Sequence, residues 1–328
     1  MPNWGAVLNK IREAEKKHGS AAHDNVRRKY LAQLQSHTGR NIIAYYSGFL
    51  TKPRVEGIEI NDEDKNGFMM CIHETDKSKG LDLILHTPGG DGAATESLIH
   101  YLKEMFGKDI RAIVPQISMS AGTIIACACK EIVMGKHSNL GPIDPQVGGI
   151  PAFGVLREIE RAFADISSDP RYAMIWTPIL SRLTPSFVQQ CQWAIERAQE
   201  FGVEALKDNM FSTLPDKENL ANEVISRLSN LSSNKAHNRH LHYQECKDMK
   251  LKIAMLEDDQ KLQDLVLTVH HSYMHTLANT GAFKIIENHK GRAFVKINVQ
   301  QVVQIGQQKG QPTQQQLGQL FEPSSPTF

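Results

Sequence analysis

Short apolar runs alternate with amphipathic helical patterns through the middle of the chain. The runs at residues 81–85, 110–115 and 131–135 have the length of buried strands. Each of the first two is followed by a turn of small residues and then by a helical pattern of apolar positions. Buried strands that alternate with helices are typical of parallel βα units. The pattern therefore predicts an α/β fold with a parallel sheet, centred on residues 81–146.

Helical patterns dominate on both sides of this stretch. Before it, apolar residues at helical spacing fill residues 4–35, with a break at Gly19 and Ser20, and a strand is expected at 41–47. After it, we expect helices, a short helix leading into a strand, a long helix and a hairpin, at residues 153–166, 186–210, 218–231, 243–256, 262–277 and 282–297. From residue 299, glutamine, glycine, proline and serine dominate, as in disordered segments. The predicted organisation is an N-terminal helical segment, a core domain, a C-terminal helix with a hairpin, and a disordered tail, at residues 1–40, 41–260, 261–298 and 299–328.

The composition is that of an ordinary globular protein. Among 328 residues, 41% are hydrophobic and 22% are charged, with a formal net charge of +1. This balance gives no reason to expect nucleic acid or an anionic membrane as a partner. The apolar runs are too short to span a bilayer, and the N-terminus turns charged from Lys10 without the apolar segment of a signal peptide. Because the five cysteines are odd in number and scattered, we expect reduced thiols and a cytoplasmic location.

Two patterns resemble metal sites without completing one. Residues 62–67 copy the first half of a calcium loop, but His73 stands at the twelfth position, where a bidentate glutamate is needed. A helix N-terminus with acids in its first turn is the simpler interpretation. His271 and His275 are spaced to share a helix face, but no adjacent glutamate completes a zinc motif. We predict no metal and no other cofactor.

A serine between a strand and a helix is the strongest candidate for chemistry. Ser120 precedes small residues that would let a carbonyl group approach the helix N-terminus, where the Ala121 N–H could stabilise a developing oxyanion. A second N–H could come from the Gly89-Gly90 turn that ends the neighbouring strand, because glycine permits the required backbone conformation. Ser120 would then be the nucleophile, with Ala121 and Gly90 as donors. The nucleophile elbow of α/β-hydrolases is excluded, since Ser118 stands where that motif has glycine.

Three motifs together resemble the serine dehydrogenase proteinase family. They are Thr-Pro-Gly-Gly at 87–90, Ser-Ala-Gly-Thr at 120–123 and Gly-Pro-Ile-Asp-Pro-Gln at 141–146. That family belongs to the Clp-protease/crotonase superfamily and is related to signal peptide peptidase A. The resemblance implies a Clp-protease/crotonase-like spiral of βα units flanked by N- and C-terminal helices, a serine nucleophile, a peptide or protein substrate and self-assembly. We therefore expect a homo-oligomer, with the apolar segments 124–129 and 155–164 as candidate interfaces.

The general base is the point where the sequence departs from its relatives. Ile143 and Asp144 occupy the place of the histidine in the Clp proteolytic subunit, so a histidine triad is not carried over. Relatives such as signal peptide peptidase A use a lysine instead, and Lys136 is our leading candidate because it lies near the site in sequence. Asp144, between two prolines, is expected either to orient a base or to cap a turn. The other candidates for the base are Lys130, His86 and His137.

Three functions remain compatible with these motifs. The first is a cytoplasmic serine peptidase that acts through an acyl-enzyme on Ser120. The second is a crotonase-like enzyme that uses the same N–H donors to hold a thioester enolate and needs no nucleophile. The third is a non-catalytic oligomeric scaffold that has lost its base. A covalent serine probe separates the first from the other two.

Overall fold

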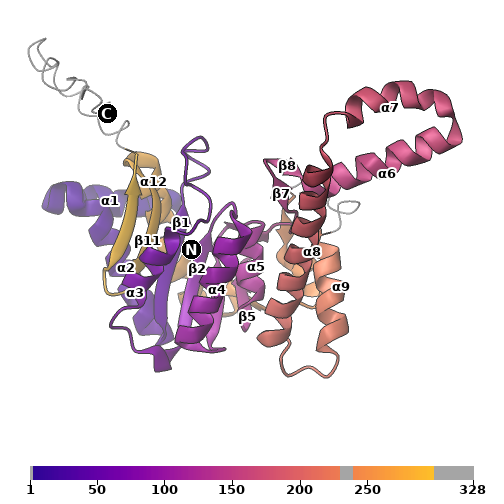
Figure 1. Cartoon of the computed structure of the whole chain (residues 1–328). Coiled ribbons are helices and arrows are strands. Elements are labelled where there is room, and N and C mark those ends of the chain that lie inside the picture. The colour runs from indigo at the N-terminus through magenta and orange to yellow at the C-terminus, as the bar shows by residue number, and fades with distance from the viewer. Residues whose placement is uncertain (1–2, 230–238, 299–328) are drawn as a thin grey trace, which may run out of the picture.

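The computed structural model describes residues 3–229 and 239–298, and a seven-stranded sheet forms its centre (Figure 1). The strand order is β10-β5-β3-β2-β1-β11-β12. In chain order these strands are β1 (Asn41–Ser47), β2 (Leu81–His86), β3 (Ile110–Val114), β5 (Glu131–Met134), β10 (Ile253–Met255), β11 (Ala282–Asn288) and β12 (Ala293–Ile297). The neighbours from β10 to β1 are parallel, while β11 pairs antiparallel with β1 and β12 pairs antiparallel with β11. The predicted parallel sheet is confirmed.

Two smaller sheets extend the fold beyond the carboxyl ends of the central strands. In one, β4 (Ile117–Ser118) pairs parallel with β6 (Asn139–Leu140), which pairs antiparallel with β9 (Leu241–His242). The other is the hairpin of β7 (Gln146–Val147) and β8 (Ile150–Pro151). A bridge between Thr87 and Ser118 joins the end of β2 to β4. The segments that carry the three motifs are thereby brought to one end of the sheet.

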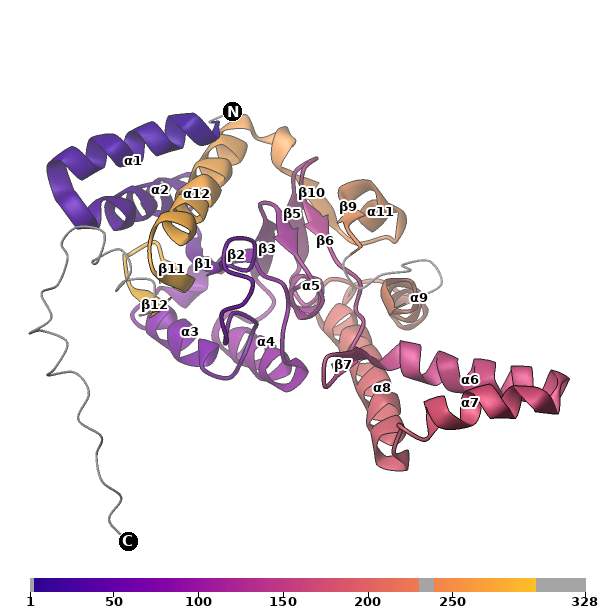
Figure 2. The same cartoon turned by 90° about the horizontal axis from the view of Figure 1, so that it is seen from above.

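Helices cover both faces of the central sheet. Figure 2 shows α1, α2 and α12 on one side of it and α3 and α4 on the other. The α-helices are α1 (Trp4–His18), α2 (Ala22–Thr38), α3 (Asp64–Ile72), α4 (Gly92–Phe106), α5 (Ala121–Cys127), α6 (Ala152–Ser168), α7 (Ala173–Leu180), α8 (Pro185–Asp208), α9 (Lys217–Ser229), α11 (Tyr243–Asp248) and α12 (Gln260–Asn279). Short 3₁₀ helices lie at Gly19–Ala21, Lys77–Lys79, Pro170–Tyr172 and Leu256–Asp258. None of the helices in the described parts of the chain combines the length and the apolar character needed to cross a bilayer.

The strand β2 is buried on both faces and is mainly apolar; its one charged residue, Asp82, is buried and pairs with Arg40 and Arg111. Leu81, Leu83 and Leu85 belong to the core beneath α4 and α5, whereas Ile84 belongs to the core shared with α2 and α12. A strand buried on both faces needs apolar side chains at successive positions, as is usual in parallel sheets. The helix α5 is buried over its whole length. The expected interface at residues 124–129 therefore lies in the core of the monomer and is unavailable to a partner.

The terminal segments complete the core. The helix α12 packs against α2 and α1, and β11 extends the sheet beyond β1. The predicted hairpin is confirmed, as are the two N-terminal helices divided at Gly19, whereas the pairing of β11 with β1 was not predicted. The predicted disordered tail lies outside the described residues.

An arm of helices projects from this body. Figure 1 shows α6 and α7 extending away from the sheet, joined to it through α8. The helices α6 and α8 were predicted, but α7 was not, because it is short and contains Pro178. Its side chains are not buried in the chain.

Candidate active site

Ser120 lies between β4 and α5 in a strained backbone conformation. Its φ of 50° and ψ of −116° are unfavourable for a residue with a side chain. Its carbonyl oxygen accepts hydrogen bonds from the N–H groups of Thr123 at 2.8 Å and Ile124 at 3.2 Å, so the residue begins the helix. Its hydroxyl does not cap the helix, although serine at this position usually does so. The strain thus leaves the hydroxyl of a half-buried serine available for chemistry.

The turn at Gly89 lies directly against Ser120. Gly89 has a φ of 100°, and a Cβ atom placed on it would lie 2.8 Å from Ser120 Cβ and 3.1 Å from Ala121 N. Gly122 is required for a similar reason, since a Cβ atom there would lie 2.5 Å from Ser118 Oγ. Glycines at these positions let the end of β2 and the start of α5 approach each other closely.

Hydrogen bonds to Ile60 set the direction of the Gly90 N–H. The Ile60 N–H donates to Gly89 O at 2.8 Å, and the Asp91 N–H donates to Ile60 O at 2.9 Å. In such a parallel bridge the backbone groups of the intervening residue point the other way. The Gly90 N–H therefore points away from Ile60, toward the side where β4 bridges to Thr87 and the chain continues into Ser120.

Two N–H groups beside Ser120 are left without acceptors. Ala121 is the first residue of α5, and neither its N–H nor that of Gly90 donates to any acceptor among the described residues. The N-terminus of α5 adds its positive dipole end at the same place. Two backbone N–H donors beside a nucleophile can stabilise the oxyanion that forms when the nucleophile attacks a carbonyl group.

Asp144 lies in the segment that packs against this site. The segment follows β6, and Gly141 within it contacts Met119, while Thr123 Oγ1 donates to Gly141 O at 2.9 Å. Asp144 itself is 3% exposed. The structure thus brings Gly141, the first residue of the third motif, alongside the second motif.

Comparison with known proteins agrees with this geometry. The model of the ClpP-like SDH-type serine proteinase family matches residues 15–265. The chain belongs to this family. Its fold is accordingly the predicted Clp-like α/β fold, and the family is one of serine proteinases.

Two relatives from Methanocaldococcus jannaschii, both named as uncharacterized proteins, are similar to this SDH-type chain. One is 32% identical over 187 residues, which is 56% of this chain and 58% of the relative. The other is 36% identical over 149 residues, which is 45% of this chain and 47% of the relative. The chain thus spans about half the length of the curated relatives it matches.

Lys136 lies on a different segment of this SDH-type chain from Ser120 and is exposed. It lies on an exposed turn after β5, where its N–H donates to Glu257 Oε1 at 3.0 Å. No hydrogen bond joins it to Ser120 within residues 3–229 and 239–298. Lys136 is exposed, whereas a lysine that acts as a base is usually buried. Proximity in sequence was a poor guide to proximity in space.

The other candidate bases are also placed elsewhere. His86 is fully buried toward α12, with its ring 5.4 Å from that of His270, and burial lowers the pKa of His86 to about 3. Lys130 pairs with Asp109 at 2.5 Å, and His137 is exposed. No hydrogen bond joins any of these side chains to Ser120 in the described parts of the structure.

The residues behind the Gly89-Gly90 turn were not predicted from the sequence. Ile60 was assigned no role, and Asp64 was interpreted only as an acid in the first turn of a helix. The helix is confirmed as α3, but Asp64 is buried and pairs with Lys284 of β11. A lysine within the apolar run 282–286 was the available signal, since lysine is rarely buried without a partner.

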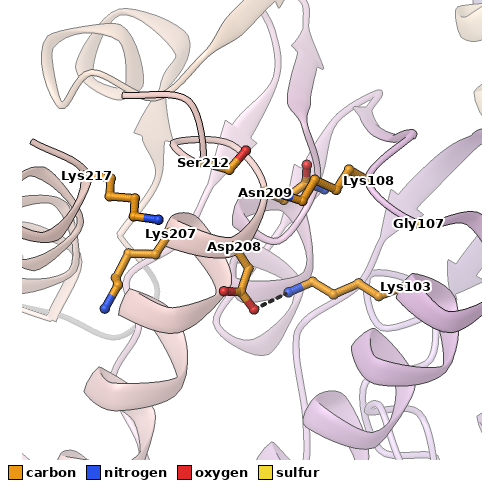
Figure 3. Close-up of a pocket in the computed structure, with 8 residues that line it drawn as sticks. All are labelled: Lys103, Gly107, Lys108, Lys207, Asp208, Asn209, Ser212 and Lys217. Carbon is orange, nitrogen blue, oxygen red and sulfur yellow. Dashed lines mark hydrogen bonds and ion pairs between the residues drawn. The ribbon is translucent and has the colours of Figure 1, made fainter. Parts of the chain in front are cut away.

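A cavity of about 330 Å³ lies away from Ser120, near the amino end of β3 (Figure 3). It is lined mainly by lysines and by residues at the ends of α4 and α8, namely Lys103, Gly107, Lys108, Lys207, Asp208, Asn209, Ser212 and Lys217. Lys103 Nζ lies 3.4 Å from Asp208 Oδ2. Both helices end here, so lysines in their last turns complement the negative ends of the helix dipoles. This accounts for Lys103 and Lys207 without a ligand.

Proposed function

We propose that this protein is a serine peptidase that cleaves peptide or protein substrates through an acyl-enzyme on Ser120. The observation that carries the proposal is the strained Ser120, whose hydroxyl leaves α5 uncapped between the free N–H groups of Gly90 and Ala121. Membership of a serine proteinase family supports the same chemistry.

In the proposed reaction, Ser120 Oγ attacks the carbonyl carbon of the scissile peptide and loses its proton to a base. The carbonyl oxygen becomes an oxyanion that accepts hydrogen bonds from the Gly90 and Ala121 N–H groups. Collapse of this intermediate breaks the C–N bond, and the protonated base supplies the proton of the leaving amine. Water then attacks the ester and restores Ser120.

Asp144 is proposed to orient the group that accepts the proton. Its burial beside the segment that contacts Met119 supports this role. Since no side chain of the described residues forms a hydrogen bond with the Ser120 hydroxyl, we propose that the proton acceptor reaches Ser120 only in the substrate complex. Catalytic hydrogen bonds commonly tighten at that stage.

Labelling with a fluorophosphonate tests the nucleophile. We expect intact mass to show one label on the wild type and none on Ser120→Ala, and peptide cleavage to fall by about 10⁴- to 10⁶-fold, as expected for loss of a nucleophile. Ser118→Ala is the matched control, because this serine is two residues away and fully buried. It should keep the label, and Lys136→Met should label like the wild type because Lys136 is exposed.

Other outcomes of this experiment would replace the proposal. A label that persists on Ser120→Ala would show that another residue is the nucleophile. A wild type that neither labels nor cleaves peptides, but turns over acyl thioesters, would be a crotonase-like enzyme. A wild type with none of these activities would be a scaffold.

We also propose that the enzyme is a homo-oligomer that associates through its helical arm. Phe163, Met174 and Ile175 are 77%, 83% and 57% exposed there, and exposed apolar groups of this kind mark interaction surfaces. Sedimentation velocity at micromolar concentration should show an oligomer for the wild type and for Arg157→Glu, an exposed control on α6. Phe163→Glu combined with Met174→Glu should give monomers with an unchanged melting temperature. A monomeric wild type would contradict the proposal.

A reducing compartment such as the cytoplasm is proposed for this enzyme. All five cysteines lie in the described ranges as free, buried thiols. This state is usual for proteins of reducing compartments and supports the location inferred from cysteine number.

A further inference from the structure

A buried ion pair lies behind the Gly89-Gly90 turn. Lys284 of β11 and Asp64 of α3 are 0% and 1% exposed, and Lys284 Nζ lies 2.8 Å from Asp64 Oδ1 and 3.0 Å from Oδ2. Removing two charges from water is costly, and apolar residues of similar volume often stabilise a fold equally well. Stability alone therefore gives little reason for a lysine and an aspartate at these positions.

The pair is directed at one short segment of backbone, residues 59–61. Lys284 Nζ donates a further hydrogen bond to Glu59 O at 2.6 Å. Asp64 Oδ2 accepts from the Asn61 N–H at 3.1 Å and from the Tyr45 hydroxyl at 2.8 Å. Both sides of Ile60 are therefore held by the ion pair.

Ile60 in turn holds the glycine turn. It accepts from the Asp91 N–H and donates to Gly89 O, and a Cβ atom on Gly90 would lie 2.3 Å from Ile60 N. Such close backbone contact leaves no room for either segment to shift alone. The turn has one further anchor at the end of β2, where Thr87 Oγ1 accepts from the Gly89 N–H at 3.1 Å.

We propose that Lys284 and Asp64 are positioning residues that fix the Gly89–Asp91 turn through Ile60 and so aim the Gly90 N–H toward Ser120. An ammonium with several directed donors can fix a carbonyl group and a carboxylate at once, which an apolar side chain cannot do. The consequence for catalysis rests on the proposed function, but the effect on the turn does not.

Hydrogen exchange tests the effect on the turn without any activity. In Lys284→Met, the Ile60 and Asp91 amides, which donate the two hydrogen bonds of the bridge, should exchange about 10-fold faster or more, because the bridge opens locally. Amides in the middle of α4 should be unchanged. Lys296→Met is the matched control, since Lys296 lies opposite Lys284 on β12 but pairs with the exposed Glu63. It should leave the turn unchanged.

The rate of fluorophosphonate labelling tests the consequence for chemistry. Lys284→Met should lower the maximal rate of labelling by about 10- to 100-fold, with little change in probe affinity, because the oxyanion donor is misaligned. Lys284→Met combined with Asp64→Leu removes the uncompensated charge and should regain stability. It should still label slowly, because Glu59 O has lost its donor.

Hydrogen exchange and the rate of labelling distinguish the effect on the turn from the effect on catalysis. Turn amides that exchange at the wild-type rate in folded Lys284→Met, or in the double variant if the single one does not fold, would overturn the positioning role. Wild-type labelling rates in the double variant would overturn its importance for catalysis. A wild type that never labels would defeat the proposed function, while hydrogen exchange would still decide whether the pair fixes the turn.

Discussion

Gly89→Ala is expected to reduce both peptide cleavage and labelling of Ser120 by at least about 100-fold, the effect of losing one oxyanion donor. The added methyl group would lie 2.8 Å from Ser120 Cβ, 2.9 Å from Met119 O and 3.1 Å from Ala121 N. The first two distances are shorter than real Cβ contacts, the third is tighter than most of them, and two of these neighbours are backbone atoms that cannot rotate aside. The φ of 100° adds strain. Initial rates of peptide cleavage and of labelling measure the effect.

Gly92→Ala is the matched control for this substitution. Gly92 lies three residues further along, at the start of α4, where an added Cβ atom has no neighbour within 4 Å. Alanine also favours the helix more than glycine does. Gly92→Ala should therefore keep the wild-type rates and melt no lower than the wild type. Equal activity of the two variants would show that the Gly89 turn does not border the reacting atoms.

The local patterns of the sequence were sufficient for most of the fold. Periodicity and small residues located β2, α4, β3 and α5, because these signals arise from neighbours along the chain. The Gly89-Gly90 turn and the turn at Ser120 were located in the same way, since each directly follows a strand. Burial of residues 124–129 was also expected, but whether a buried helix packs in its own chain or against another copy depends on tertiary structure.

Contacts between distant residues could not be predicted. Lys284 and Asp64 are 220 positions apart, and the bridge from Ile60 to Gly90 joins a loop to a turn. The acids at 62–64 indicate a helix start, which is correct, but the same pattern does not reveal that Asp64 faces inward. Lys136 shows the converse, because it is only 16 positions from Ser120 and yet lies exposed on the turn after β5.

Arg27→Met is expected to lower the free energy of unfolding by about 3–5 kcal/mol, the usual cost of breaking a buried ion pair from one side. Arg27 of α2 and Glu287 of β11 are 1% and 0% exposed, and Arg27 Nε donates to Glu287 Oε2 at 2.9 Å. The Tyr273 hydroxyl of α12 donates to the same oxygen at 2.8 Å. Methionine would fill much of the volume and leave Glu287 with a buried charge. Urea unfolding followed by circular dichroism measures the change.

Arg28→Met separates burial from charge in this cluster. Arg28 Nε donates to the other oxygen of Glu287 at 3.0 Å, but the Arg28 side chain is 41% exposed. Water screens and replaces this interaction, so the variant should cost no more than about 1 kcal/mol. Equal losses for the two variants would mean that the charge of Glu287, and not the burial of its partner, sets the stability.

The cluster joins α2, α12 and β11, on the face of the sheet opposite α4 and α5. Folded Arg27→Met should therefore label at the wild-type rate, because the Gly89 turn and the start of α5 keep their contacts.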